Sequence, residues 1–227
     1  MDVTQAIAQR RSVRSFRSDP APESTVREIL DLAARSPSGG NVQPWKVYAL
    51  AGARLQGLVD EVAAKLPVNG LAGDGDLEYA VYPRDLWEPH STYRFTVGEE
   101  LYRTLGIARE DRAGRRRQFA ENFRFFGAPV GLIFCIDRRM GPPQWADVGM
   151  FLQSVMLLAE ERGLATCAQE AWSVWHKTVR RYCAVPDELI VFCGMALGYP
   201  DDDHPTAALR TSRADLDDFA VFDGFEA

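Results

Sequence analysis

Apolar residues recur every three or four positions in several stretches of the chain, which is the spacing of one face of an α-helix. The clearest stretch is Gln144–Arg162, which is apolar on most sides and must therefore be covered on most sides, by the fold or by a second subunit. Asp2 or Thr4 can cap the first helix, Gly163 can end the long one, and Ser173 can begin a helix reaching Cys183. Further helices are expected at 3–10, 23–35, 53–66, about 98–106 and 109–125.

Two uninterrupted apolar runs, Pro129–Asp137 and Leu189–Leu197, predict strands that are buried on both faces. Lys46–Ala51 and the short Ala165–Gln169 are expected to add two more strands.

Residues 67–98 show neither the helical spacing of apolar residues nor the alternation of a strand, yet they contain Tyr79, Tyr82, Trp87 and Tyr93. A long aperiodic segment within a compact chain is usually either disordered or functional, and the aromatic residues argue against disorder. We therefore expect an excursion that covers another part of the molecule.

The tail from Pro200 onward is acidic, but it also carries large apolar side chains. A tail of this kind is expected to dock on a surface, and a partner subunit is a suitable one. The apolar residues are Leu216, Phe219, Val221, Phe222 and Phe225.

The bulk composition narrows the class of protein. The 227 residues fit one domain, 46% of them are hydrophobic, and the net charge of −6 argues against nonspecific nucleic-acid binding. Four cysteines without a CxxC pair and three scattered histidines argue against a zinc site. Cys135 and Cys193 lie in apolar runs, as buried free thiols of a reducing compartment do. With no signal-peptide pattern and no long apolar span, we expect a soluble, cytoplasmic protein.

Basic residues gather in two places that lie far apart in the sequence. Arg10, Ser12 and Arg14 alternate, so an extended segment would turn all three to one side. Arg210 and Arg213 form a second basic cluster within the acidic tail. One phosphate could satisfy both clusters through charge-assisted hydrogen bonds; the alternative is a solvated basic patch.

Two loops could approach a flat ligand. Gly39 and Gly40 allow close approach of the backbone in the loop Pro37–Trp45, although an ordinary helix-to-strand connection would use the same residues. At Gln169–Trp172 a strand leads into a helix start, where free N–H groups can hold an electron-rich atom. The chain has no GxGxxG dinucleotide motif and no recognisable hydrolase triad.

Five motifs together resemble the FMN-dependent nitroreductase superfamily, specifically the bacterial nitroaromatic reductases, over essentially the whole chain. The first two, in this order and spacing, are the most specific. They are RRSVRSF at 10–16, SPSGGNVQPW at 36–45, FFGAPVGLIFCID at 125–137, GLATCAQEAW at 163–172 and LRTSR at 209–213.

The resemblance implies an α+β fold with a central, mostly antiparallel mixed sheet flanked by helices, in an intertwined homodimer with FMN at the interface. It implies one domain over 1–227, with a variable insert at about 67–126 and an arm at about 200–227 that docks on the partner subunit.

The resemblance also assigns roles around the flavin. Arg10, Ser12 and Arg213 would contact the phosphate, with Arg11 in a supporting role, and Arg14 would lie at the N1/O2 edge of the ring. The backbone N–H of Glu170 would face N5; Ala171 beside it departs from the glycine that is frequent in the family. Pro37, Ser38 and Gly39 of the partner subunit would cover one face of the ring, supported by Asn41 and Gln43. Gln169 and Arg210 complete the set of FMN-binding residues.

Two further groups of residues are candidates for the rest of the site. The candidate walls of the substrate pocket are Tyr93, Phe123, Phe126 and Trp172. The candidates for contact with the pyrimidine end of FMN are Arg115, Gln118 and Asn122.

The resemblance points to an NAD(P)H-dependent reductase of nitroaromatic compounds that works by ping-pong two-electron transfer, with the flavin carrying the chemistry and no metal. The alternatives are a quinone or enone reductase, a dehalogenase or a flavin-cleaving relative on the same scaffold. A flavin-binding protein without turnover, and a dimeric domain that binds another anion, are non-enzymatic alternatives.

Overall fold

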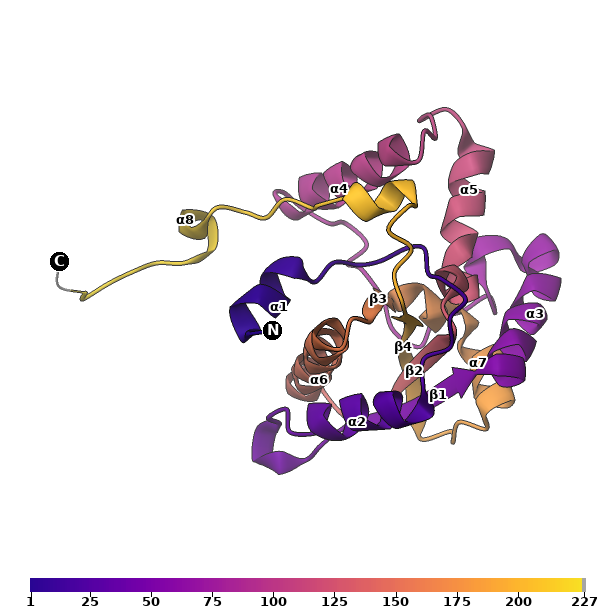
Figure 1. Ribbon diagram of the computed structural model, residues 1–227, viewed down its shortest axis with the longest axis horizontal. Coiled ribbons are helices and arrows are strands. Elements are labelled where there is room, and N and C mark those ends of the chain that lie inside the picture. Colours follow the sequence, from indigo (N-terminus) through magenta and orange to yellow (C-terminus); the bar gives the residue numbers. More distant parts are fainter. Residues whose placement is uncertain (226–227) are drawn as a thin grey trace.

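A computed structural model describes residues 1–225 of the chain as an α+β fold around one sheet (Figure 1). The sheet order is β1 (Trp45–Ala51), β2 (Val130–Asp137), β4 (Leu189–Gly198) and β3 (Ala165–Gln169), and each neighbouring pair is antiparallel. A single parallel bridge, between Ser12 and Thr166, extends the sheet beyond β3. The predicted fold class and all four predicted strands are confirmed.

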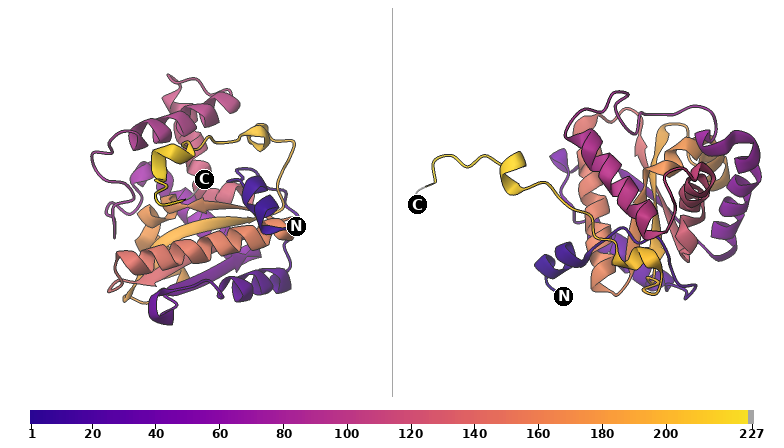
Figure 2. Two further views of the ribbon diagram at one scale, coloured as in Figure 1. Left: turned by 90° about the vertical axis from the view of Figure 1, so that its left-hand side faces the viewer. Right: turned by 90° about the horizontal axis from the view of Figure 1, so that it is seen from above.

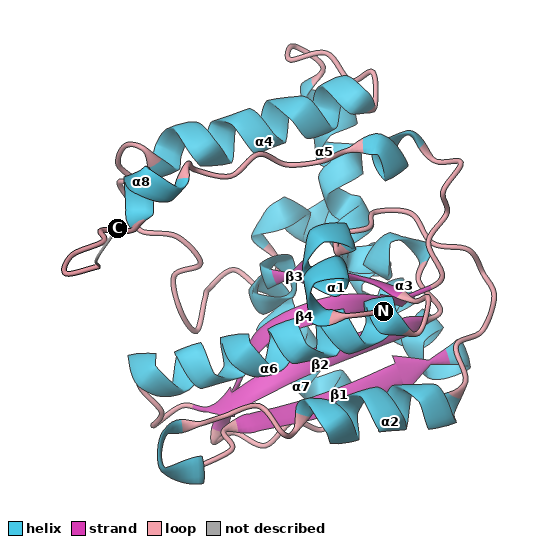
Figure 3. Ribbon diagram, turned by 60° about the vertical axis from the view of Figure 1, so that its left-hand side comes forward, coloured by secondary structure: helices cyan, strands magenta, loops and turns pink. Residues whose placement is uncertain are grey.

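Helices cover both faces of the sheet, because its central strands are apolar on both sides. Within β2, Leu132, Phe134 and Ile136 pack toward α2 and α6, whereas Ile133 and Cys135 pack into the opposite cluster with α3 and α7. This alternation is the period of two of a β-strand applied to a strand buried on both faces. Figure 3 shows α2 and α6 on one side of the sheet.

The helices match most of the predicted segments. Asp2 caps the first helix as expected: its side chain accepts from the Gln5 N–H at 2.8 Å. None of the helices in the described part of the chain is both long enough and apolar enough to span a bilayer. The helices are α1 (Val3–Gln9), α2 (Glu23–Ala33), α3 (Gly52–Asn69), α4 (His90–Thr104), α5 (Arg112–Ala120), α6 (Pro142–Glu161), α7 (His176–Cys183) and α8 (Leu216–Phe219), with short 3-10 helices η1 (Gly39–Asn41), η2 (Gly70–Ala72), η3 (Glu121–Gly127), η4 (Glu170–Trp175) and η5 (Pro205–Ala208).

Two expected boundaries are wrong. Helix α4 begins at His90, within the segment expected to be irregular, and the helix expected at 109–125 is divided into α5 and η3. Phe125 and Phe126 have φ values of +50° and +53°, which an α-helix cannot accommodate. Both rings are buried, so packing in the core outweighs the local helical preference at these positions.

The predicted cap of α7 is also wrong. Ser173 is buried in η4, where its hydroxyl donates to the Glu170 carbonyl at 2.7 Å, and α7 begins at His176. The cap comes instead from the aperiodic segment: Asp74 accepts from both the N–H and the hydroxyl of Thr178, each at 2.8 Å. The segment is therefore anchored to α7 before it continues toward α4.

The C-terminal tail leaves the body of the molecule. Figure 2 shows it projecting well beyond the helices, with α8 as a single short turn. Its aromatic side chains are exposed, Phe219 by 71% and Phe222 by 62%. Among residues 1–225, Phe222 packs against Phe225 of the same tail, and these aromatic side chains otherwise remain largely exposed.

Candidate functional site

The basic segment near the N-terminus lies along the free edge of β3. Ser12 bridges Thr166, and the Val13 N–H donates to the Thr166 carbonyl at 3.0 Å. Val13 is buried between Ser12 and Arg14, which leaves those two on the outer side, as the alternation predicted. Burial raises the pKa of the Cys167 thiol on β3, and the nearby Arg14 and Arg10 oppose that rise.

The N-terminal and C-terminal basic clusters meet at the end of α6. Partial burial raises the pKa of Glu160, and the positive charges of Arg11, Arg10 and Arg210 act against this rise. Arg11 also forms an ion pair with Asp202 at 2.9 Å. Three arginine charges from both ends of the chain thus act on Glu160, and against the two carboxylates of Glu160 and Asp202 they leave an excess of positive charge suited to an anion.

Arg213 does not complete this cluster in the single subunit. Its guanidinium donates to the Thr211 hydroxyl at 2.7 Å and to the Ser212 carbonyl at 2.8 Å, both within its own segment. Among residues 1–225, no hydrogen bond joins it to Ser12. The tail residue that the structure brings to the arginine cluster is Arg210.

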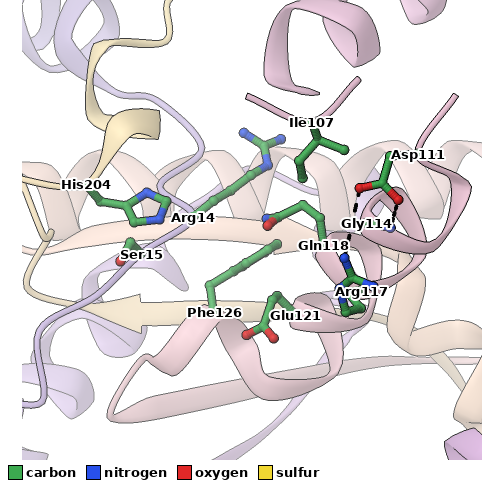
Figure 4. A pocket seen from close by; sticks show the side chains of 10 residues that line it. All are labelled: Arg14, Ser15, Ile107, Asp111, Gly114, Arg117, Gln118, Glu121, Phe126 and His204. Carbon is green, nitrogen blue, oxygen red and sulfur yellow. Dashed lines mark hydrogen bonds and ion pairs between the residues drawn. The ribbon is translucent and has the colours of Figure 1, made fainter. Parts of the chain in front are cut away.

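A cavity of about 400 Å³ opens beside Arg14 (Figure 4). The Arg14 guanidinium points toward Gln118 and Ile107, and His204 closes the side near Ser15. Gln118 is one of the three mid-chain candidates for the pyrimidine end, and Phe126 is one of the candidate walls. The full lining is Arg14, Ser15, Ile107, Asp111, Gly114, Arg117, Gln118, Glu121, Phe126 and His204.

The other two mid-chain candidates are engaged elsewhere. Arg115 forms a two-pronged ion pair with Glu99, at 2.6 and 3.1 Å, which holds α5 against α4. The Asn122 backbone carbonyl accepts from the buried side chain of Gln169 at 2.7 Å, so η3 is tied to the end of β3.

Two residues of the aperiodic segment, Tyr82 and Arg94, lie near Glu170 at the end of β3. Partial burial raises the pKa of Glu170, while the neighbouring Tyr82 hydroxyl and Arg94 act in the opposite direction. The Arg94 guanidinium lies over the Tyr82 ring, 4.2 Å from its centroid. Tyr82 and Arg94 of the excursion therefore lie near Glu170, which itself remains exposed and whose backbone N–H is the sequence-based candidate for contact with the ring.

The glycine loop holds an unusual backbone conformation. Gly40, Asn41 and Gln43 have φ values of +58°, +56° and +48°, and Gln43 donates from its N–H to the Ser38 hydroxyl at 3.0 Å. The Gly39 N–H is held from outside the loop by Asp147 on α6. Positive φ at residues other than glycine is uncommon and is found most at functional sites, which makes this loop a candidate for ligand contact.

Two of the candidate substrate-pocket walls are core residues. Phe123 is 1% exposed and Trp172 is 0% exposed; they pack edge to face against each other with centroids 5.8 Å apart. Neither side chain can line an open pocket in this conformation. Tyr93 on α4 is exposed, whereas Phe126 lines the cavity.

Sequence reasoning missed several residues of this region, namely Tyr82 and Arg94 beside Glu170, Glu160 among the arginines, and Asp111 and His204 at the cavity. None stands in a recognisable motif; their positions follow from tertiary packing. Among residues 1–225, no three His, Cys, Asp or Glu side chains form a group suited to a metal ion.

The sequence and the site together identify the protein family. The sequence model of the family named "Nitroreductase family" matches residues 7–199, which include the basic segment, the glycine loop and the end of β3. The chain belongs to the nitroreductase family.

Individual members of the family show which proteins the chain is similar to. The chain is 37% identical over 220 residues to a chloronitrobenzene nitroreductase of Comamonas testosteroni, covering 97% of this chain and 96% of that one. It is similar to the crystal structure of an FMN and NADPH-dependent nitroreductase, NfnB, from Sphigopyxis sp. strain HMH, with a TM-score of 0.95, 46% identity and coverage of 99% and 100%. It is also 45% identical over 204 residues to a 5,6-dimethylbenzimidazole synthase of Rhodospirillum rubrum, covering 88% and 83%.

Proposed function

We propose that the chain is an FMN-dependent NAD(P)H nitroreductase that reduces nitroaromatic compounds by ping-pong two-electron transfer. The observation that carries the proposal is the parallel bridge of Ser12 to Thr166, which aligns the basic segment with β3, the strand that ends at Gln169 immediately before Glu170. The residues proposed for the phosphate and those proposed for the ring are thereby close to the same strand, which supports the proposal. The names of the nitroreductase relatives support the same reading.

The residues present fit FMN. Arg10 and Arg210 supply positive charge and Ser12 a hydroxyl at one end, which suits a phosphate. Arg14 faces the cavity, where its charge would stabilise the negative charge that the ring gains on reduction. When bound, FMN supplies the two-electron chemistry between NAD(P)H and the nitro group.

We propose the full set of roles that the resemblance assigned. Arg10, Ser12 and Arg213 hold the phosphate, Arg11 supports them through Asp202, and the Glu170 N–H orients the ring edge. Pro37, Ser38 and Gly39 cover the ring of the partner subunit, so each site needs two chains. Arg213 would then leave its own segment for the phosphate when FMN binds.

We also propose the domain layout expected from the sequence: one domain, a variable insert at about 67–126 that shapes the substrate side, and an arm from about residue 200 that docks on the partner. The exposed aromatic residues of the arm support this layout. A cytoplasmic location completes the proposal.

Anaerobic spectroscopy tests the function. Purified protein is expected to carry a yellow flavin chromophore, to lose it on addition of NADPH or NADH, and to regain it on addition of nitrobenzoate. A colourless protein that gains no absorbance with added FMN contradicts the cofactor. A chromophore that NAD(P)H leaves unchanged points to a flavin-binding protein without turnover.

A second candidate is flavin cleavage, which the likeness to the 5,6-dimethylbenzimidazole synthase favours. Reduced protein exposed to air distinguishes the two functions. A nitroreductase recovers its flavin absorbance in full, whereas a flavin-cleaving enzyme loses it irreversibly. Quinone and enone acceptors in the same assay test the remaining alternatives.

A further inference from the structure

Asp147 is a buried carboxyl group in the second turn of α6, and the proposed function gives it no role. It is only 5% exposed. Within residues 1–225 its recorded hydrogen-bond donor is the Gly39 N–H, 3.3 Å from Oδ1 and 3.2 Å from Oδ2, and it takes part in no recorded ion pair. A buried carboxyl group is costly unless its partners compensate it, so its presence calls for a specific purpose.

The group that Asp147 holds is the start of the glycine loop. Gly39 is the first residue of η1, immediately before Gly40 and Asn41 with their positive φ values. A residue other than glycine in this conformation costs roughly 1–3 kcal/mol and persists only where the surroundings fix it. Bonds within the loop, from Gln43 to Ser38 and Asn41, are local and do not fix its place in the molecule.

A second link binds the same loop to the same helix. The Ser36 hydroxyl lies 2.7 Å from the Ser154 hydroxyl, two helical turns after Asp147. The first half of the loop is therefore held at both ends by α6. The Ser36 hydroxyl also donates to the Met150 carbonyl of α6 at 3.4 Å, but only Asp147 accepts from an N–H group within the loop itself.

We infer that Asp147 is a positioning residue for FMN, acting through the Gly39 N–H to hold the Pro37–Gln43 loop in its ligand-covering conformation. The inference rests on the proposed function, since it takes that loop to cover the ring. Asp147 itself touches Gly39 and contributes no contact to the ligand. Its effect belongs in the affinity for FMN, separately from the stability of the fold.

Two substitutions separate these effects. Asp147→Asn keeps an oxygen that can accept from Gly39 but buries an NH₂ group without an assigned partner, whereas Asp147→Ala removes the acceptor. Both variants are expected to unfold at lower urea concentration than the wild type. Only Asp147→Ala is expected to bind FMN more weakly, by about tenfold, which corresponds to one lost hydrogen bond. Ser154→Ala, which removes the contact between the Ser154 and Ser36 hydroxyls, serves as the control and is expected to stay within about twofold.

The measurement is the FMN dissociation constant, from the recovery of flavin fluorescence when FMN-loaded protein is diluted. An Asp147→Ala constant equal to that of the wild type, an Asn variant as weak as the Ala variant, or an equal loss in Ser154→Ala overturns the inference alone. A wild-type protein that binds no FMN overturns the proposed function, and the inference with it.

A second pair of variants carries the test if Asp147→Ala does not fold. Gly39→Pro removes the donated N–H while leaving Asp147 in place, and proline is well tolerated at the first position of a helical turn. Gly39→Ala keeps the N–H, and its Cβ meets no atom within 4 Å in the described chain. FMN is expected to bind Gly39→Pro about tenfold more weakly than Gly39→Ala, and equal binding overturns the inference.

Discussion

At the scale of single residues, Arg14 is the group whose charge bears most directly on the proposed chemistry. It lies on the outer side of the segment along β3 and faces the cavity beside Gln118 (Figure 4). Its guanidinium donates to the Ser12 carbonyl at 3.1 Å, so its position is fixed from within its own segment. A fixed cation stabilises developing negative charge without reorganisation.

Arg14→Met should therefore make bound FMN harder to reduce while leaving it bound. The loss of one nearby charge is expected to slow reduction by NAD(P)H about tenfold, or about 1.4 kcal/mol. Stopped-flow reduction and the midpoint potential measure the effect, with the exposed Arg112→Met as a control that changes neither. Reduction of the Arg14 variant at the wild-type rate would show that the assigned role is wrong.

We expect the four cysteines to make the free energy of unfolding depend on pH. Burial raises the pKa of Cys135 to about 12 and that of Cys183 to about 11, and it also raises those of Cys167 and Cys193. In the unfolded chain thiols ionise near pH 8.5. Above that pH the unfolded state binds fewer protons than the folded state, so the free energy of unfolding falls as the pH rises.

The expected result is a stable plateau below about pH 8 and a decline toward pH 10 in urea unfolding. Each thiol contributes a slope of up to about 1.4 kcal/mol per pH unit. Cys135→Ala should flatten the decline, whatever its effect on the stability at pH 7. A decline of unchanged slope in that variant would show that the protons released on unfolding come from other groups.

At the scale of elements, the anchor of the aperiodic segment is open to a direct test. Asp74 supplies the cap of α7, and Lys65 of α3 donates to the same Thr178 hydroxyl at 2.7 Å. Asp74→Ala should lower the free energy of unfolding by about 1–2 kcal/mol, as the loss of a helix cap does. Asp187→Ala, whose side chain is fully exposed, should change it by less than about 0.5 kcal/mol. Equal values for the two variants would contradict the capping role.

The same elements show which parts of the fold the sequence could predict. β2 and α6 carry dense, periodic apolar patterns, so their type and place follow from burial alone. The start of α7 does not, because its cap is separated from it by about one hundred residues of chain. The positive φ values at Phe125 and Phe126 could not be predicted from the sequence either, because they are stabilised by aromatic rings that come together only in the folded core.

The candidate site divides in the same way. Arg10, Ser12 and Arg14 are recognisable from their alternation, and the loop 37–43 from its glycines. Glu160, Asp147 and Tyr82 stand in no motif, because each acts through a contact made across the fold. Whether Phe123 and Trp172 line a pocket or pack in the core depends on their burial in the folded chain, which their spacing in the sequence does not reveal.

At the scale of the whole molecule, the arm and the glycine loop point to the same requirement. The arm carries exposed Phe219, Phe222 and Phe225 away from the body. The glycine loop has positive φ values at residues other than glycine, a backbone conformation that is costly to maintain. A homodimer would cover both. The proposed FMN site and the proposed dimer are therefore one hypothesis, and disrupting the arm should weaken both.

The combined substitution Phe219→Ser with Phe222→Ser tests this coupling. Each fully buried phenylalanine contributes about 1.5–3 kcal/mol, and a symmetric dimer buries four of these rings. The dimer dissociation constant is expected to rise at least about a hundredfold, with loss of bound FMN in step. Sedimentation equilibrium and flavin absorbance measure the two effects on the same samples. Asp217→Asn with Asp218→Asn alters the charge of the same turn without its apolar surface, and should leave both unchanged. A wild-type monomer, or a variant that dissociates but keeps its FMN, would separate the arm from the cofactor site.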